Sequence, residues 1–167
     1  MTKEPMTQYG YEKLVKELKH LKETERPEIV KEIDVARSHG DLKENAEYHA
    51  AKEKQAFIEV RIHELGNILA MAHVIDPAAL PHARVSFGST IKVMDVETEI
   101  EHSYTIVGAV ESDPHRGYVS YHSPLAKALI GKEEGDIVVA QMPNGTRELE
   151  VLEVGYKEIS FETESVE

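Results

Sequence analysis

The stretch that decides the fold is ARSHGDLKENAEYHAAKEKQ, Ala36 to Gln55. On either side of it apolar residues recur at spacings of three and four, which is typical of amphipathic helices. Between the two patterns stand Gly40 and several polar residues, which favour a turn. Two long helices joined by a short turn form an antiparallel hairpin. The sequence therefore predicts a coiled-coil helical hairpin over residues 1–75, with an acidic tip at 41–44.

The apolar seam of each arm supports this prediction. The second arm has the heptad spacing of a coiled coil: Ala51, Gln55, Ile58, Ile62, Leu65, Leu69 and Ala72. The first arm has two partial seams, one residue out of phase: Leu14, Leu18 and Leu21, then Ile29, Ile33, Ala36 and Gly40. We expect the slip to fall at Pro27, which lacks a backbone donor and should kink or restart the helix. An arm of about 30 residues would be roughly 45 Å long.

Beyond Ala72 the helical spacing ends. A linker with two prolines is expected at 76–84, and alternating apolar residues after it indicate strands. The expected strands cover residues 85–93, 104–110, 118–121, 137–142 and 147–154. Ser123 caps one short predicted helix that stops near Gly131, and Asn144-Gly145 predicts a hairpin between the last two strands. The fold class is α+β, with a mostly antiparallel sheet.

The two halves of the chain differ in charge. Residues 1–75 carry 12 Lys and Arg against 14 Asp and Glu, residues 76–167 carry 7 against 17, and the net charge is −12. Sequence-independent duplex binding is driven by cationic surface, so this balance argues against it. We place the β-rich domain at 85–158 and an acidic tail at 159–167, of which residues 160–167 are expected to fray.

The composition also restricts the compartment. There is no Cys, which excludes disulfides and thiolate metal sites and fits a reducing compartment. No apolar run approaches the roughly 18 residues of a membrane span, and the first residues lack the apolar core of a signal peptide. We therefore expect a soluble cytoplasmic protein.

Asp41 and Glu44 lie three residues apart in the predicted turn, and two interpretations are open. In the one that spacing favours, Asp41 caps the second helix while Glu44 reaches back. In the other, the pair binds a divalent cation: like charges about 4 Å apart repel by roughly 4 kcal/mol at an effective dielectric of about 20, and a cation reverses that sign. Two carboxylates cannot complete the six oxygen ligands of Mg²⁺. The turn would then be half of a site that another molecule completes.

Other residues around the tip also allow two interpretations each. His39 and His49 flank the turn and would suit Zn²⁺, although solvated histidines are commoner. Asn45 is a weak ligand and is expected to shape the turn. Tyr48 either packs against the opposite arm or stacks on a base. The cations around the tip either pair with neighbouring Glu or contact a phosphate backbone: Arg37, Lys43, Lys52 and Lys54.

Five segments together resemble the bacterial Gre transcript cleavage factors, and within them the GreA type. The segments are HGDLKENAEYHAAKEKQ (39–55), VSFGSTIKV (85–93), YTIVG (104–108), SPLAKALIGKEEGDIV (123–138) and PNGTRELEVLEV (143–154). The resemblance runs from about Met6 to Tyr156. The tail beyond Tyr156 is longer than the family leads one to expect.

The resemblance implies a coiled-coil hairpin followed by an FKBP-like domain that binds bacterial RNA polymerase at the mouth of its secondary channel. The hairpin would reach the catalytic centre, where Asp41 and Glu44 help to hold a Mg²⁺ ion shared with the polymerase, one that the isolated protein would not bind tightly. Arg37 and Lys52 would form a basic spot facing the 3′ end of the nascent RNA. A backtracked polymerase then cuts its own transcript, so the factor is expected to be an activator, not an enzyme, and a monomer without a membrane partner.

Two other functions stay open from the sequence. A relative with the same architecture would occupy the channel and inhibit transcription, although the presence of both acids favours cleavage. A prolyl isomerase or chaperone built on the second domain would need an aromatic-lined pocket. Residues 77–167 offer few rings for one: Phe87, Phe161, Tyr104, Tyr118, Tyr121 and Tyr156.

Overall fold

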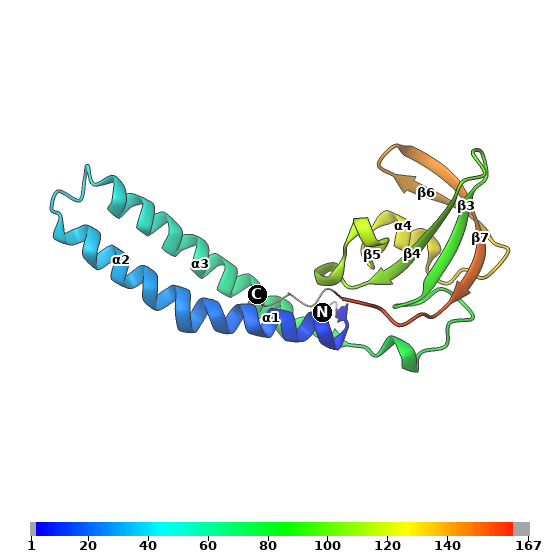
Figure 1. Cartoon of the computed structure of the whole chain (residues 1–167), viewed down its shortest axis with the longest axis horizontal. Helices are drawn as coiled ribbons and strands as arrows, with labels where there is room; N and C mark the ends of the chain where they lie inside the picture. The colour runs from blue at the N-terminus through cyan, green and yellow to red at the C-terminus, as the bar shows by residue number, and fades with distance from the viewer. Residues whose placement is uncertain (1–2, 162–167) are drawn as a thin grey trace. The chain divides into compact units, whose positions relative to one another are not determined.

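The computed structural model describes residues 3–161. The chain forms two compact units (Figure 1): residues 11–72 are the first, and residues 3–10 join the chain from His73 onward in the second. Residues 3–10, which were expected to be part of the hairpin, therefore belong to the second unit. The reason is a strand pairing invisible in local sequence: β1, Glu4–Met6, pairs with β2, Ala72–Val74, in a small two-stranded sheet.

The first unit is the predicted helical hairpin (Figure 1). It contains most of α1 Gln8–His20, whose first three residues belong to the second unit, followed by a π-helical turn Leu21–Glu25, α2 Arg26–Ser38 and α3 Ala46–Met71. The predicted seams are buried in both arms at Leu14, Leu21, Ile29, Ile33, Ala36, Ala51, Ile58, Ile62 and Leu65. Gly40, expected to continue the first seam, is exposed, because α2 has already ended. Leu18, Gln55, Leu69 and Ala72 of the predicted seams are only partly buried. The seam prediction is thus confirmed at the buried positions and holds in part at these four.

The phase slip of the first arm comes from the π-helical turn Leu21–Glu25. There the N–H of Arg26 donates to the carbonyl of Leu21, five residues back. A π turn adds one residue to the helix, which accounts for the change of phase. Pro27 follows directly, and a wider turn gives its ring more room beside the carbonyl four residues earlier. The slip is near the predicted place, but an inserted residue before the proline produces it.

Two arginines of the hairpin bind the opposite arm. Arg26 donates from Nε and Nη2 to the two carboxylate oxygens of Glu59, at 2.8 and 2.9 Å. Arg61 donates in the same way to Glu17, at 2.8 and 3.1 Å. Such paired hydrogen bonds are directional. They therefore fix how the two arms align along their length, which the non-directional packing of the apolar seam does not do alone.

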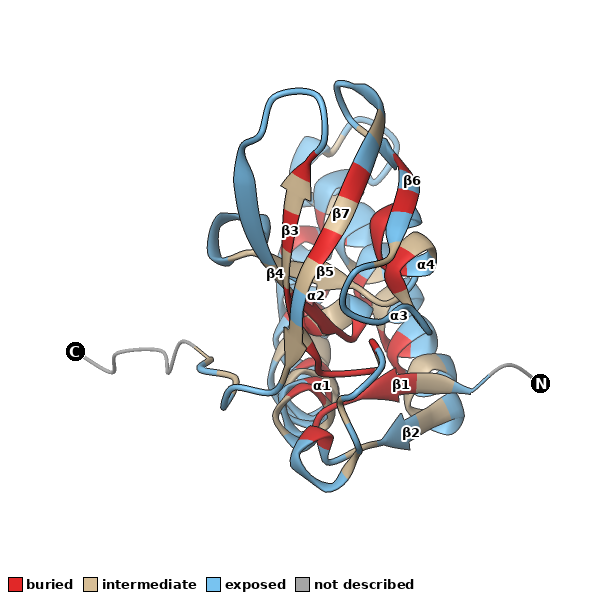
Figure 2. Cartoon of the chain, turned by 90° about the vertical axis from the view of Figure 1, so that its right-hand side faces the viewer, coloured by how far each residue is buried: buried red, intermediate tan, exposed pale blue. Residues whose placement is uncertain are grey.

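The second unit is built on a five-stranded sheet of order β5-β4-β3-β7-β6. The strands are β3 Thr90–Asp95, β4 Glu101–Val107, β5 Tyr118–Ser120, β6 Ile137–Met142 and β7 Gly145–Gly155. Buried residues alternate along β3 and β7 (Figure 2) and form one core with α4, Pro124–Leu129. Every neighbouring pair is antiparallel except β4 and β5, which run parallel. The sheet is thus mixed. The FKBP-like description of this domain stays a prediction.

Local signals in this unit were mostly correct. Ser123 caps α4, its hydroxyl accepting from the N–H of Ala126 at 3.1 Å. The β6–β7 hairpin forms with Met142 opposite Gly145, so the turn lies at Pro143-Asn144, one residue earlier than predicted. No helix within residues 3–161 combines the length and apolarity that a membrane crossing requires.

The first predicted strand is shorter than expected. It begins at Thr90, whereas Val85 and Phe87 are buried in a loop. Gly88 breaks the strand with a φ of +83°, and a Cβ at this position would lie 2.8 Å from Cγ of Pro77. Only glycine combines this backbone conformation with so close a neighbour. The expected linker is therefore partly packed, since Pro77 is itself buried.

The stretch expected to fray begins with two residues that make defined contacts, Ser160 and Phe161. The carbonyl of Ser160 accepts from Nη1 of Arg116 at 2.7 Å and from the hydroxyl of Tyr118 at 2.8 Å. The ring of Phe161 stacks on Tyr9 with centroids 4.2 Å apart. Fraying is thus wrong for these two residues, and the rest of the predicted tail, 162–167, lies outside the described residues.

A buried carboxylate holds the N-terminal segment of the second unit. Glu111 accepts from the N–H of Thr7 at 2.6 Å and from the N–H of Gly108 at 3.2 Å. Its side chain is almost fully enclosed. Burial raises the pKa of Glu111, although both N–H donors favour its charged form.

This raised pKa predicts a pH dependence. The folded protein binds more protons than the unfolded chain between the usual Glu pKa and the raised one, so the stability contributed by Glu111 falls as pH rises through that window. Glu111→Gln cannot ionise, so its stability relative to wild type should improve as pH rises from the usual Glu pKa, about 4.3, through the raised pKa of Glu111. Urea unfolding of both proteins across this range measures the difference. A pH-independent difference would contradict the prediction.

Candidate functional site

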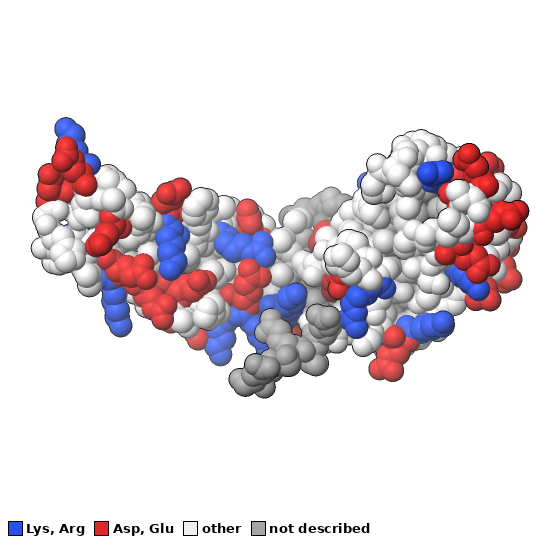
Figure 3. Space-filling model, turned by 45° about the horizontal axis from the view of Figure 1, so that its top comes forward, with Lys and Arg blue, Asp and Glu red and all other residues white. Residues whose placement is uncertain are grey.

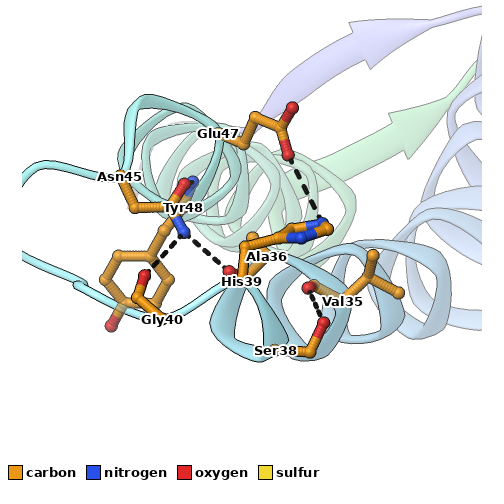
Figure 4. A network of polar contacts seen from close by, with 8 residues as sticks. All are labelled: Val35, Ala36, Ser38, His39, Gly40, Asn45, Glu47 and Tyr48. Atoms are coloured by element: carbon orange, nitrogen blue, oxygen red, sulfur yellow. Dashed lines mark hydrogen bonds and ion pairs between the residues drawn. The ribbon is translucent and has the colours of Figure 1, made fainter.

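The turn at the tip of the hairpin joins α2 to α3 (Figure 4). Gly40 has a φ of +77°, and Asp41, although not glycine, also has a positive φ of +35°. The N–H of Glu44 donates to the carbonyl of Asp41 at 3.3 Å. The backbone thus reverses direction at Gly40 and Asp41, and a further tight turn carries the chain to Glu44.

Asn45 caps α3. Its Oδ1 accepts from the N–H of Tyr48 at 3.0 Å, and the helix begins at Ala46. The interpretation of Asp41 and Glu44 as a capping pair is therefore wrong, because the cap position lies after both of them. Sequence reasoning expected Asn45 to shape the turn but missed its role as cap. The signal was available, since Asn is among the preferred N-cap residues.

Asp41 and Glu44 are exposed. Within residues 3–161, neither carboxylate makes a hydrogen bond or an ion pair. The same residues contain no group of three or more His, Cys, Asp or Glu that could bind a metal ion. The two carboxylates thus have no partner among the described residues. Carboxylate oxygens are hard ligands, which suit Mg²⁺ or Ca²⁺ more than a soft metal.

The cations around the tip have different partners. Lys54 pairs with Glu32 of the opposite arm at 3.9 Å, as the ion-pair interpretation predicted. Lys52 donates to Oε1 of Gln55 at 3.2 Å, and Arg37 lies over the ring of Tyr48, 5.9 Å from its centroid. Among the described residues, neither Arg37 nor Lys52 has a carboxylate partner.

Lys43, in the turn itself, also forms no ion pair within the described chain. Tyr48 packs against Arg37 of the other arm, so the packing interpretation of Tyr48 is confirmed.

Acidic and basic side chains are interspersed along the hairpin, whereas acidic residues gather on the second unit (Figure 3). The charges of the hairpin therefore do not exclude contact with a phosphate backbone.

The two histidines beside the turn do not share a site. Nε2 of His39 lies 3.9 Å from Oε2 of Glu47, and Nε2 of His49 lies 3.1 Å from the carbonyl of Lys43. Each ring thus has a different neighbour, and the described residues offer no third ligand. The structure gives no support to the Zn²⁺ interpretation.

Comparison with known proteins identifies the family. Residues 4–74 match the family model described as "Transcription elongation factor, N-terminal", and residues 80–156 match "Transcription elongation factor, GreA/GreB, C-term". The protein is 67% identical to Transcription elongation factor GreA of Wolinella succinogenes, over 97% of this chain and 100% of that protein. It is 65% identical to the GreA of Helicobacter hepaticus, over 97% and 99%.

Among solved structures, the GreA factor homolog 1 of Thermus thermophilus is similar to this protein, with 28% sequence identity and a TM-score of 0.43. The alignment covers 92% of this chain and 99% of that chain. A TM-score this low adds no weight to the assignment. The two family models, which cover most of the chain, and relatives of more than 60% identity decide it. This chain belongs to the GreA/GreB family of transcription elongation factors.

Proposed function

We propose that this protein binds bacterial RNA polymerase, inserts its hairpin into the secondary channel and stimulates the polymerase to cleave a backtracked transcript. Release of a short 3′ RNA fragment lets elongation resume. One observation carries the proposal: two exposed carboxylates without partners in the described chain stand at the tip of a two-helix hairpin. Membership of the elongation factor family supports it.

The dimensions of the hairpin fit the role. Helix α3 has 26 residues, so it is about 39 Å long at 1.5 Å per residue. Cross-arm pairs such as Arg26 with Glu59 keep the two helices in register. The tip is thus carried on a long, thin support, as reaching into a channel requires.

The donor chemistry of the tip fits Mg²⁺. Asp41 and Glu44 would hold the ion together with groups of the polymerase, since Mg²⁺ is usually bound through one or two carboxylates plus water and phosphate. When bound, the ion would stabilise charge on the oxygens of the phosphodiester undergoing hydrolysis. Asp41 and Glu44 supply negative charge at a defined place, and the isolated protein should bind the ion weakly because it offers too few ligands.

The basic spot completes the proposed site. Arg37 and Lys52 lie on the two arms close to the tip and have no carboxylate partner in the described chain. Both are therefore available to phosphates near the 3′ end of the RNA. Arg37 is also held against Tyr48, which restricts where its guanidinium can lie.

In this proposal the protein is an activator and has no nuclease activity alone. It acts as a monomer in the cytoplasm, where bacterial transcription takes place. RNA incubated with the isolated protein and Mg²⁺ should stay intact, because the two carboxylates neither complete a metal site nor contact a nucleophile.

A cleavage assay tests the proposal. Purified polymerase complexes, backtracked and labelled at the RNA 3′ end, should release short labelled fragments when the protein and Mg²⁺ are added. Complexes halted in the active register should release none, and omission of Mg²⁺ should stop the reaction. A regulator that only occupies the channel would slow elongation without releasing fragments, and that result would overturn the proposal.

A further inference from the structure

The turn that carries Asp41 and Glu44 is held by one side chain. Nδ2 of Asn45 donates to the carbonyl of Ala36 at 2.6 Å and to the carbonyl of Gly40 at 3.4 Å (Figure 4). Its Oδ1 accepts from the N–H of Tyr48. Ala36 lies in the last turn of α2, and Tyr48 lies in the first turn of α3. One amide thus connects the end of one arm, the turn and the start of the other arm.

The cap alone does not require Asn. Ser and Asp cap helices about as well, because each offers an oxygen to the first free N–H groups. Neither of them can reproduce the other two contacts, since an ionised Asp has no donor and the hydroxyl of Ser is too short to accept from α3 and reach α2 as well. The amide of Asn45 is the feature that both accepts and donates.

These donated bonds bear directly on Asp41. The Gly40 carbonyl belongs to the planar peptide that links Gly40 to Asp41, so a bond to that oxygen restrains the orientation of the whole peptide plane. The φ of Asp41 is measured from this plane and is +35°. An L residue rarely adopts a positive φ unless its surroundings hold it there. Asn45 therefore helps to keep Asp41 in a conformation that is uncommon for a residue other than glycine.

The bonds also close a short ring of backbone. Asp41 to Glu44 lie between the restrained Gly40 carbonyl and Asn45 itself, and the bond from Glu44 N–H to Asp41 O spans the same segment. The only other side chain that bonds to the main chain of this segment, among the described residues, is His49, at the carbonyl of Lys43. Since neither carboxylate has a partner in the described chain, the backbone determines where they point.

We propose that Asn45 is a positioning residue for transcript cleavage: its amide holds the backbone of the turn so that Asp41 and Glu44 face a shared cation together. The role rests on the proposed function, and it acts through the two acids. Free rotation of the turn would let each carboxylate bind separately. A displacement of about 1 Å can cost about a hundredfold in rate.

Asn45→Ser separates the two tasks, because it keeps the cap and loses both donated bonds. The matched control is Asn67→Ser, the same change at an exposed position of α3. With backtracked complexes, Asn45→Ser should lower the maximal cleavage rate by about tenfold to a hundredfold. The factor concentration for half-maximal effect should stay within about twofold, and more Mg²⁺ should be needed. A variant with the wild-type maximal rate would overturn the proposal.

A second readout needs no polymerase. The N–H of Gly40 donates to the carbonyl of Arg37 at the end of α2, and the N–H of Glu44 donates to the carbonyl of Asp41. Amide hydrogen exchange at both should be faster by about tenfold in Asn45→Ser, because two restraining hydrogen bonds are lost. Asn45→Asp, which keeps the shape of the side chain and the cap, should show the same increase. Unchanged exchange in both variants would overturn the positioning role. Wild-type protein that released no RNA would instead contradict the proposed function, and the exchange result would still decide whether Asn45 orders the turn.

Discussion

Asp41→Asn is expected to lower the stimulated cleavage rate by about a hundredfold or more while leaving polymerase binding unchanged. The two side chains have the same shape, so the turn and the buried seam should not respond. The change removes one negative charge and one strong metal ligand from a pair that is exposed and has no partner within the described chain. Stabilisation of charge by a bound cation is worth several kcal/mol, and about 2.7 kcal/mol already corresponds to a hundredfold.

The measurement is release of labelled 3′ RNA at saturating factor, with binding read from the concentration for half-maximal effect. Asp34→Asn is the matched control, because Asp34 is an exposed acid on α2 away from the turn. It should behave as wild type. Glu44→Gln should resemble Asp41→Asn, and the double variant should lose little more, since both acids serve one ion. If Asp41→Asn cleaved as fast as wild type, that result would contradict the proposed role of Asp41 in binding the cation.

Gly10→Ala is expected to destabilise the second unit by about 2–3 kcal/mol. Gly10 lies in α1, where replacing Gly by Ala would ordinarily stabilise by about 1 kcal/mol. The structure reverses this sign, because a Cβ would lie 2.8 Å from Cδ and 2.9 Å from Cγ of Glu111. That carboxylate is buried and accepts from Thr7 and Gly108, so moving it leaves buried N–H groups without an acceptor.

Gly66→Ala is the matched control, since Gly66 lies in α3 with open space around its Cα. It should stabilise its helix by up to about 1 kcal/mol. Urea unfolding of the two variants should therefore shift in opposite directions. In a double-mutant cycle, Glu111→Ala should relieve most of the penalty of Gly10→Ala, because it removes the atoms that the new methyl group meets. A stabilising Gly10→Ala would contradict the contact.

The elements that the sequence predicted well depend on near neighbours in the chain. The seam residues Ile58, Ile62 and Leu65 are buried where the heptad spacing placed them. Ser123 caps its helix as expected. In each case the decisive interaction joins residues two to four positions apart, or repeats along one face, so the pattern is visible without knowledge of the rest of the molecule.

The candidate site could be predicted only in part from residues that are close together in the chain. The spacing of Asp41 and Glu44 identified the turn and its acids, but did not determine whether they cap the helix or face outward. That depended on where α3 begins, and Asn45 competed with Asp41 for the cap. Both types are good caps, so local preference could not separate them. The bonds from Asn45 to Ala36 and Gly40 link the two arms and exist only once the hairpin has closed.

By itself, then, the sequence determined that the chain has a two-helix hairpin with two acids at its turn and a β-rich domain after it. Only the tertiary structure decided that residues 3–10 belong to the second unit, that β4 and β5 run parallel, and that Glu111 is buried against Thr7. The physical reason is the distance along the chain. Periodicity records which face of an element is buried, whereas pairing between distant segments depends on packing that no single segment encodes.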